Sequence, residues 1–293
     1  MYHKAGAIIP CHVLLFLCFA FRWQSVFSIM AAPNIVVVGG SSGMGKAAAC
    51  SAVKRGGTAL LVSRSEDKLE RAAEEIRSQT GGFGTVRTAV LDASDEEAVR
   101  EFAEKLGSDW DGLVVSAAGR APHGPVTTLD TSATRALFET KFWSAYHCAK
   151  WISPKLREGG AVTFVAGVLN RRPGLNCSPL AATNGALEGL TKALALELGP
   201  RLRVNCLSPG FCDTERFDHM DPDSKVAMLA NTAESLPLKR VGEPADMGEA
   251  IYYLLTAKFC TGVILDVDGG HGIRQYANSS SDPMRQSQAK TST

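Results

Sequence analysis

The chain has 293 residues, 45% of them hydrophobic, and its 31 Lys+Arg against 30 Asp+Glu leave a formal charge of +1. This length suffices for one sizeable core, and a near-neutral chain without a basic stripe is not expected to bind nucleic acid. The eight cysteines show no C-x-x-C pair and no zinc-type spacing with histidine, so we expect neither a metal site nor a disulfide framework.

The N-terminal residues leave two interpretations open. The apolar stretch over residues 7–21 is short for a stable membrane span but typical of a targeting sequence. Alternatively, Met30 is the true start, directly before the first predicted strand. The protein is then expected in the cytoplasm, whereas targeting by residues 1–29 would send it to an organelle or the secretory route. We expect one domain over residues 30–277 and a disordered tail over residues 278–293.

The first predicted strand, over residues 35–38, leads into a glycine-rich turn and then into an alanine-rich helical stretch over residues 47–53. The turn consists of Gly39, Gly40, Ser41, Ser42, Gly43, Met44 and Gly45. Glycines let the backbone approach a ligand, and the N-terminus of the following helix presents unpaired N–H groups to an anion. Because a strand precedes this turn and a helix follows it, the sequence favours a nucleotide site over a merely tight turn.

Apolar runs then alternate with helical patterns along the chain. Strands are predicted over residues 58–63, 86–91, 113–116, 161–165, 203–208 and 262–267. Helices are predicted over residues 66–79 and 95–106, with Ser65 and Ser94 as N-caps, and over residues 131–157 and 180–198. This alternation predicts an α/β fold, a Rossmann-like doubly wound parallel sheet of about seven strands between two helical layers, with the ligand at the carboxyl ends of the strands.

The last predicted helix carries small residues on one face. Gly185 and Gly189 stand four residues apart, with alanines nearby. Such a face lets another helix come close, and it packs either against the sheet or against a second subunit. In the second case the two long helices would form a homodimer or homotetramer.

Ser63 and Arg64 end the second strand, where a dinucleotide fold meets the adenosine ribose. No acidic residue stands there to bind the ribose hydroxyls of NAD. Arg64 instead offers a planar set of donors to a 2′-phosphate, and such charge-assisted bonds contribute roughly 1.5 to 3 kcal/mol each. The sequence therefore favours NADP(H) over NAD, unless Arg64 is only an exposed residue at the start of the next helix.

These residues together resemble the short-chain dehydrogenase/reductase family over about residues 34–273. Beyond the glycine turn, the matching positions are Asp92, Ala118, Gly119, Pro209, Gly210 and Thr214. The resemblance implies that Asp92 meets the adenine ring and that the segment around Pro209 holds the nicotinamide end. It also implies that residues 211–240 form a lid over the substrate, and the apolar residues there suggest a small, hydrophobic or mixed molecule.

The resemblance fails at the catalytic residues. Family enzymes use a Tyr with a Lys four residues later, a Ser on the fifth strand and an Asn in the preceding helix. The alignment puts Leu180, Asn184, Gly167 (or Ala166) and Lys141 at these four positions in turn. Leucine has no proton to give, and asparagine can bond a ribose hydroxyl but carries no charge that shifts a neighbour's pKa. We therefore expect ordinary carbonyl reduction to be slowed by roughly 10² to 10⁴.

Two functions follow from this pattern. The first is an NADP(H)-dependent oxidoreductase that acts on a small, hydrophobic carbonyl, alcohol or activated alkene, with Lys141 or Ser178 as a non-standard proton donor. Cys177, His123 and Tyr146 are less well placed for that role. The second is a non-catalytic NADP(H)-binding protein that serves as a sensor, scaffold or inactive partner subunit.

Overall fold

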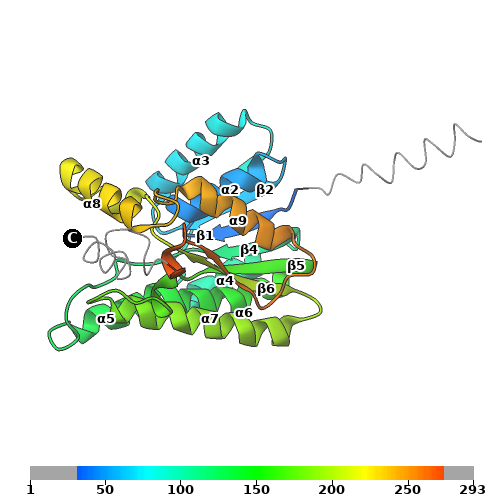
Figure 1. The fold of residues 1–293 in the computed structure, drawn as a ribbon. Helices are drawn as coiled ribbons and strands as arrows, with labels where there is room; N and C mark the ends of the chain where they lie inside the picture. Colours follow the sequence, from blue (N-terminus) through cyan, green and yellow to red (C-terminus); the bar gives the residue numbers. More distant parts are fainter. Residues whose placement is uncertain (1–31, 274–293) are drawn as a thin grey trace, which may run out of the picture. The chain divides into compact units, whose positions relative to one another are not determined.

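The computed structural model describes residues 32–273, so the predictions for residues 1–29 and 278–293 lie outside the described part of the chain. A seven-stranded parallel sheet has the order β3-β2-β1-β4-β5-β6-β7, and helices cover both of its faces (Figure 1). This arrangement confirms the predicted Rossmann-like α/β fold. Within residues 32–273, no helix is both long and apolar enough to cross a bilayer.

The strands form where the apolar runs lie. They are β1 (Ile35–Val38), β2 (Thr58–Ser63), β3 (Thr85–Val90), β4 (Trp110–Val115), β5 (Leu156–Val165), β6 (Arg203–Pro209) and β7 (Ile264–Val267). The bounds predicted for β1 and β2 are confirmed, and the other strands shift at one or both ends. All residues of β1 are buried because this strand lies between β2 and β4 and has helices on both faces, as an uninterrupted apolar run requires.

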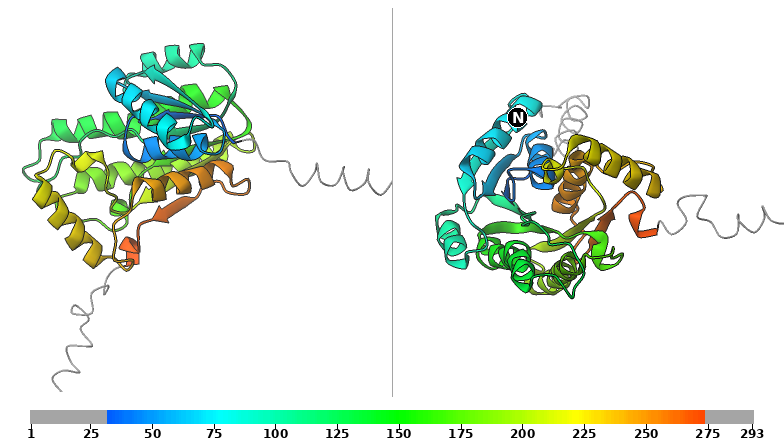
Figure 2. Two further views of the ribbon diagram at one scale, coloured as in Figure 1. Left: turned by 90° about the horizontal axis from the view of Figure 1, so that it is seen from above. Right: turned by 90° about the vertical axis from the view of Figure 1, so that its left-hand side faces the viewer.

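The helices are α2 (Gly43–Val53), α3 (Glu66–Thr80), α4 (Glu96–Lys105), α5 (Thr131–Phe138), α6 (Ser144–Ile152), α7 (Ser178–Leu198), α8 (Pro222–Ser235) and α9 (Pro244–Thr256). One core cluster joins the sheet to α2, α3 and α9. A second joins its other face to α4, α6 and α7. Figure 2 shows these two layers with the sheet between them.

The helix predictions for residues 95–106 and 131–157 were wrong in detail. The cap of α4 is Asp95 rather than Ser94, because the Asp95 carboxylate accepts the N–H groups of Glu97 and Ala98 at 3.0 and 3.2 Å. The helix predicted over residues 131–157 is interrupted by a π-helical turn, Glu139–Trp143, between α5 and α6. It ends early because Pro154 cannot donate to a helical carbonyl, and the chain enters β5 at Leu156.

Candidate active site

The glycine-rich turn is held tightly against the end of β4. A Cβ atom on Gly39, whose φ is +82°, would lie 2.6 Å from the backbone nitrogen of Ala117, and one on Gly45 would lie 2.3 Å from the carbonyl oxygen of Gly39. Only glycine fits at these two positions. Ser42 is the N-cap of α2, but its side chain makes no capping hydrogen bond. The first N–H groups of α2, which have no partner within the helix, therefore face other acceptors.

Arg64 lies exposed beyond β2, at the end of the sheet predicted to bind the adenosine. Within residues 32–273, no hydrogen bond or ion pair engages its guanidinium. Asp92 follows β3 nearby. Hydrogen bonds from Ser94 lower the pKa of Asp92 against the effect of its partial burial, and the positive charge of Arg64 lowers it further. Arg64 is thus free to bind an anion beside Asp92.

The segments after β4 and β6 both lie at the carboxyl edge of the parallel sheet. The Gly119 N–H donates to Thr140 Oγ1 at 3.0 Å. A Cβ on Gly210, which follows Pro209, would lie 2.6 Å from the Cα of Asp268. The Thr214 methyl group lies 3.5 Å from the place where a Cβ on Gly43 would stand. The structure therefore brings Thr214 against the turn.

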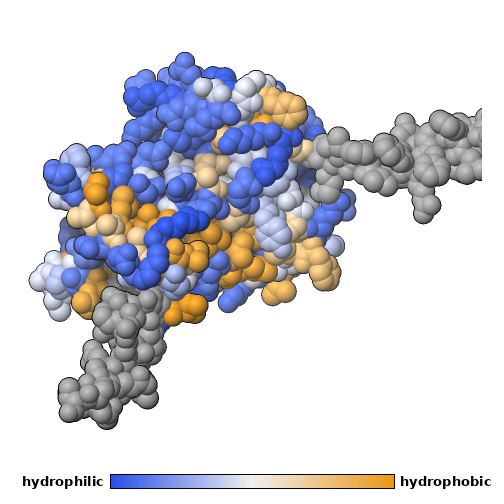
Figure 3. Space-filling model, turned by 45° about the horizontal axis from the view of Figure 1, so that its top comes forward, coloured by the Kyte–Doolittle hydropathy of each residue, from blue (hydrophilic) through white to orange (hydrophobic). Residues whose placement is uncertain are grey.

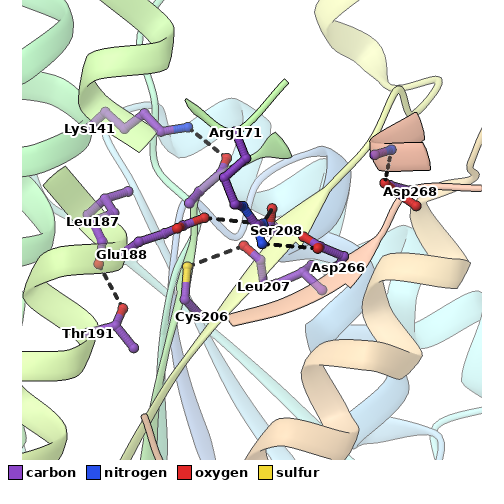
Figure 4. Close-up of polar contacts among 12 residues, drawn as sticks. Lys141, Arg171, Leu187, Glu188, Thr191, Cys206, Leu207, Ser208, Asp266 and Asp268 are labelled. Carbon is purple, nitrogen blue, oxygen red and sulfur yellow. Dashed lines mark hydrogen bonds and ion pairs between the residues drawn. The ribbon is translucent and has the colours of Figure 1, made fainter. Parts of the chain in front are cut away.

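Lys141 lies in the π-helical turn and is only 6% exposed. Its Nζ donates to the carbonyl oxygen of Ala166 at 3.0 Å, as Figure 4 shows. Burial lowers the pKa of Lys141 to about 8, and the positive charge of Arg216 acts in the same direction. An ammonium group with this pKa can release a proton near neutral pH.

Gly167 follows Ala166 directly and lies against Asn184. Its φ is +152°, and a Cβ there would lie 3.0 Å from Asn184 Nδ2. Asn184 is 1% exposed, and its Oδ1 has no hydrogen-bond partner within residues 32–273. Leu180 lies one helical turn earlier on the same face of α7. The position aligned from the sequence with the family's serine is thus a glycine whose conformation disfavours any side chain.

Ser178 does not lie on the side of α7 that carries Asn184. It is the first residue of α7 rather than a residue before the helix, and it is exposed. It lies six positions before Asn184, which puts the two on different sides of α7. Cys177 is buried and donates to the carbonyl of Gly174 at 2.8 Å. Of the two donors named from the sequence, Lys141 is the one beside Gly167.

A charged cluster surrounds Arg171, and no sequence pattern predicted it. This guanidinium contacts Glu188 of α7 at 3.3 Å, Ser208 of β6 at 2.8 Å and the Asp266 carboxylate of β7 (Figure 4). The four residues are distant in the chain, so no local pattern reveals their contact. The cluster joins α7, which carries Asn184, to the end of the sheet.

The residues present fit a dinucleotide. The turn leaves no room for side chains at Gly39 and Gly45, and the buried Oδ1 of Asn184 is an acceptor that a ribose hydroxyl would satisfy. No group of three or more His, Cys, Asp or Glu in the described part of the chain is arranged to hold a metal ion.

Comparison with known proteins identifies relatives across almost the whole described region. Residues 38–272 match a family profile described as enoyl-(acyl carrier protein) reductase. The short-chain dehydrogenase/reductase ATR9 of Stachybotrys chlorohalonatus is 31% identical over 250 residues, which cover 81% of this chain and 96% of the relative.

Two solved structures extend the similarity. A small-chain dehydrogenase in complex with NADPH has a TM-score of 0.68 and 33% identity, with 82% of this chain and 99% of that chain covered. An NADPH-bound short-chain oxidoreductase from Pseudomonas aeruginosa PAO1, described as containing an atypical catalytic center, has a TM-score of 0.75 and 26% identity. The match covers 82% of this chain and 96% of that one.

Proposed function

This chain belongs to the short-chain dehydrogenase/reductase family, and on that premise we propose that it is an NADP(H)-dependent oxidoreductase whose proton donor is Lys141. It would transfer hydride between the nicotinamide and a small carbonyl, alcohol or activated alkene. This proposal rests on the position of the buried Lys141 ammonium. It donates a hydrogen bond to the carbonyl oxygen of Ala166 and so lies next to the contact between Gly167 and Asn184.

One contact at each end of the site supports NADP(H) as the cofactor. The Arg64 guanidinium, which makes no hydrogen bond or ion pair among the described residues, would bind the 2′-phosphate that distinguishes NADP from NAD. Asn184 would accept a hydrogen bond from a ribose hydroxyl through its buried Oδ1. Among the described residues, Arg64 has no hydrogen-bond acceptor and Asn184 Oδ1 has no hydrogen-bond donor.

Lys141 would supply the proton that accompanies reduction. Bound NADPH supplies the hydride, that is one hydrogen with two electrons. Lys141 is mostly protonated at neutral pH, because its pKa is lowered only to about 8 by burial. An ammonium has three N–H donors, and one of them is used on Ala166. Lys141 would give one proton to the substrate, become a neutral amine and regain a proton from water.

Hydrophobic residues on the segment over residues 211–240 support a hydrophobic substrate. Phe211 and Phe217 stack with their ring centroids 5.1 Å apart. Figure 3 shows hydrophobic side chains gathered on the face that it presents, and Val226 and Leu238 of this segment are 66% and 63% exposed. The matching family profile, named for an enoyl reductase, supports an activated alkene as one substrate type.

A homo-oligomer through the mid-chain helices is part of the proposal. Trp143 and Tyr146 are 40% and 41% exposed and make an edge-to-face contact at 5.7 Å. On α7, Leu196 is 84% exposed. Exposed aromatic and aliphatic side chains on these helices are the kind that a second subunit covers. Sedimentation of the protein would test this part by itself.

The central experiment combines NADPH binding with a substrate screen of carbonyls and enones. Lys141→Arg keeps the positive charge but removes a readily released proton, so it should retain NADPH affinity while turnover falls by roughly 10² to 10⁴. Ser178→Ala is the matched control and should stay active. Binding without turnover on any substrate class would favour the non-catalytic alternative, and loss of turnover in Ser178→Ala alone would refute Lys141 as donor.

A further inference from the structure

The carboxylate of Glu215 sits on the N-terminus of α2. Glu215 begins the short helix η4 (Glu215–Phe217), which follows β6. Its Oε2 accepts the Gly43 N–H at 2.8 Å, and its Oε1 lies 2.7 Å from Lys46 Nζ. An anionic side chain from a distant part of the chain thus occupies the first N–H group of this helix.

This N–H group belongs to the set that a dinucleotide's pyrophosphate would use. Ser42 leaves the first turn of α2 uncapped by its side chain, so the donors there depend on an external acceptor. Anions are favoured at this end of a helix by the unpaired N–H groups and by the helix dipole. The carboxylate of Glu215 and a phosphate group would compete for the same donor.

The negative charge of Glu215 would also keep a pyrophosphate from binding beside it. Lys46 already contacts two carboxylates, Glu75 and Glu215, each at 2.7 Å. Burial alone would raise the pKa of Glu215, but hydrogen bonds from Lys46 and the Gly43 N–H hold it below its ordinary value. Glu215 is therefore ionised at neutral pH, and a pyrophosphate beside it would meet strong repulsion.

We propose that Glu215 is an internal competitor of the cofactor's pyrophosphate, which must leave the Gly43 N–H before NADP(H) binds. The inference rests on the proposed function, since it presumes that the turn binds a dinucleotide. Glu215 then sets the affinity for the cofactor. Its departure also frees η4 from α2, so that cofactor binding is linked to the start of the segment over residues 211–240.

The contacts of η4 with α8 would carry the effect of Glu215 release to the rest of the segment over residues 211–240. Lys225 of α8 contacts Asp213 and Asp218 at 3.1 and 3.0 Å, one on each side of η4. Phe217 stacks on Phe211. These contacts tie η4 to α8, so release of Glu215 would loosen both from the turn.

The test measures NADPH binding by fluorescence titration on the full chain and on Glu215→Gln, Glu215→Ala and Glu75→Gln. Loss of a competing charge-assisted bond should tighten NADPH binding about tenfold in both Glu215 variants. Glu75→Gln is the matched control, because it removes the other carboxylate from the same lysine without touching Gly43. Its affinity should change about twofold or less, as for an exposed ion pair.

Amide hydrogen exchange gives a readout that needs no turnover. Without cofactor, peptides spanning residues 40–47 and 213–218 should exchange faster in Glu215→Ala than in the wild type. Equal NADPH affinity in the wild type and both Glu215 variants would overturn the competitor role while leaving the proposed function intact. Absence of NADPH binding in all four proteins would overturn both.

Discussion

Replacement of Lys141 by methionine should make the protein more stable at neutral pH. Lys141 is buried, its Nζ contacts a neutral carbonyl, and burial lowers its pKa from 10.5 to about 8. Each pKa unit corresponds to about 1.4 kcal/mol, so keeping this lysine charged in the folded protein costs roughly 3 kcal/mol. Loss of the hydrogen bond to Ala166 offsets about 1 kcal/mol of the gain in Lys141→Met.

The pH dependence isolates the contribution of the charge. Between about pH 8 and pH 10.5, Lys141 is protonated in the unfolded chain but mostly neutral in the folded protein. The unfolded state then binds more protons, so the free energy of unfolding of the wild type rises with pH in this window. The advantage of Lys141→Met should therefore be largest below pH 8 and shrink by roughly 3 kcal/mol by pH 10.5.

Urea denaturation of both proteins at several pH values measures this difference. Lys192→Met, which removes an exposed lysine of α7, is the control and should show no such trend. A difference between Lys141→Met and the wild type that stays constant from pH 7 to pH 10.5 would show that Lys141 titrates as an ordinary surface lysine. Lys141 would then not be a proton donor poised near neutral pH.

Three further substitutions test separate contacts. Gly45→Ala should abolish NADPH binding, since its Cβ would lie 2.3 Å from the Gly39 carbonyl; retained affinity in a titration would contradict this. Arg64→Asp should shift the preference from NADPH toward NADH by about tenfold or more, and an unchanged ratio of dissociation constants would refute the 2′-phosphate contact. Gly167→Ser, with φ at +152°, should lower the free energy of unfolding by about 1 to 3 kcal/mol, whereas Gly189→Ser, with open space around it, should not.

The sequence reveals those parts of the fold that local patterns determine. The β1 run, the glycine turn and α2 are adjacent in the chain, and each has a signature of its own, so their order and most of their bounds could be predicted. The break after α5 escaped notice because Leu137, Lys141 and Ala145, which are buried before, within and after the π-helical turn, stand four residues apart as on one face of an α-helix. Helix periodicity therefore gave one long helix where the chain forms α5, α6 and part of β5.

The candidate site was predictable only in part. Lys141, Gly167 and Asn184 were placed by their alignment with the family, but the burial of Lys141 depends on packing between the π-helical turn and β5. The contact of Glu215 with Gly43 joins residues 172 positions apart. Neither residue type nor spacing indicates such a contact, because a glutamate in a loop is usually solvated.

We infer that the turn after β1 binds the pyrophosphate of NADP(H) while Arg64 binds the 2′-phosphate. Isothermal calorimetry with NADPH and NADH, on the wild type and on Glu215→Ala, tests both contacts in one experiment. One NADPH should bind per chain, about tenfold or more tightly than NADH, and more tightly still in Glu215→Ala. Folded protein that gives no heat with either dinucleotide, in either form, would show that the turn is not a dinucleotide site.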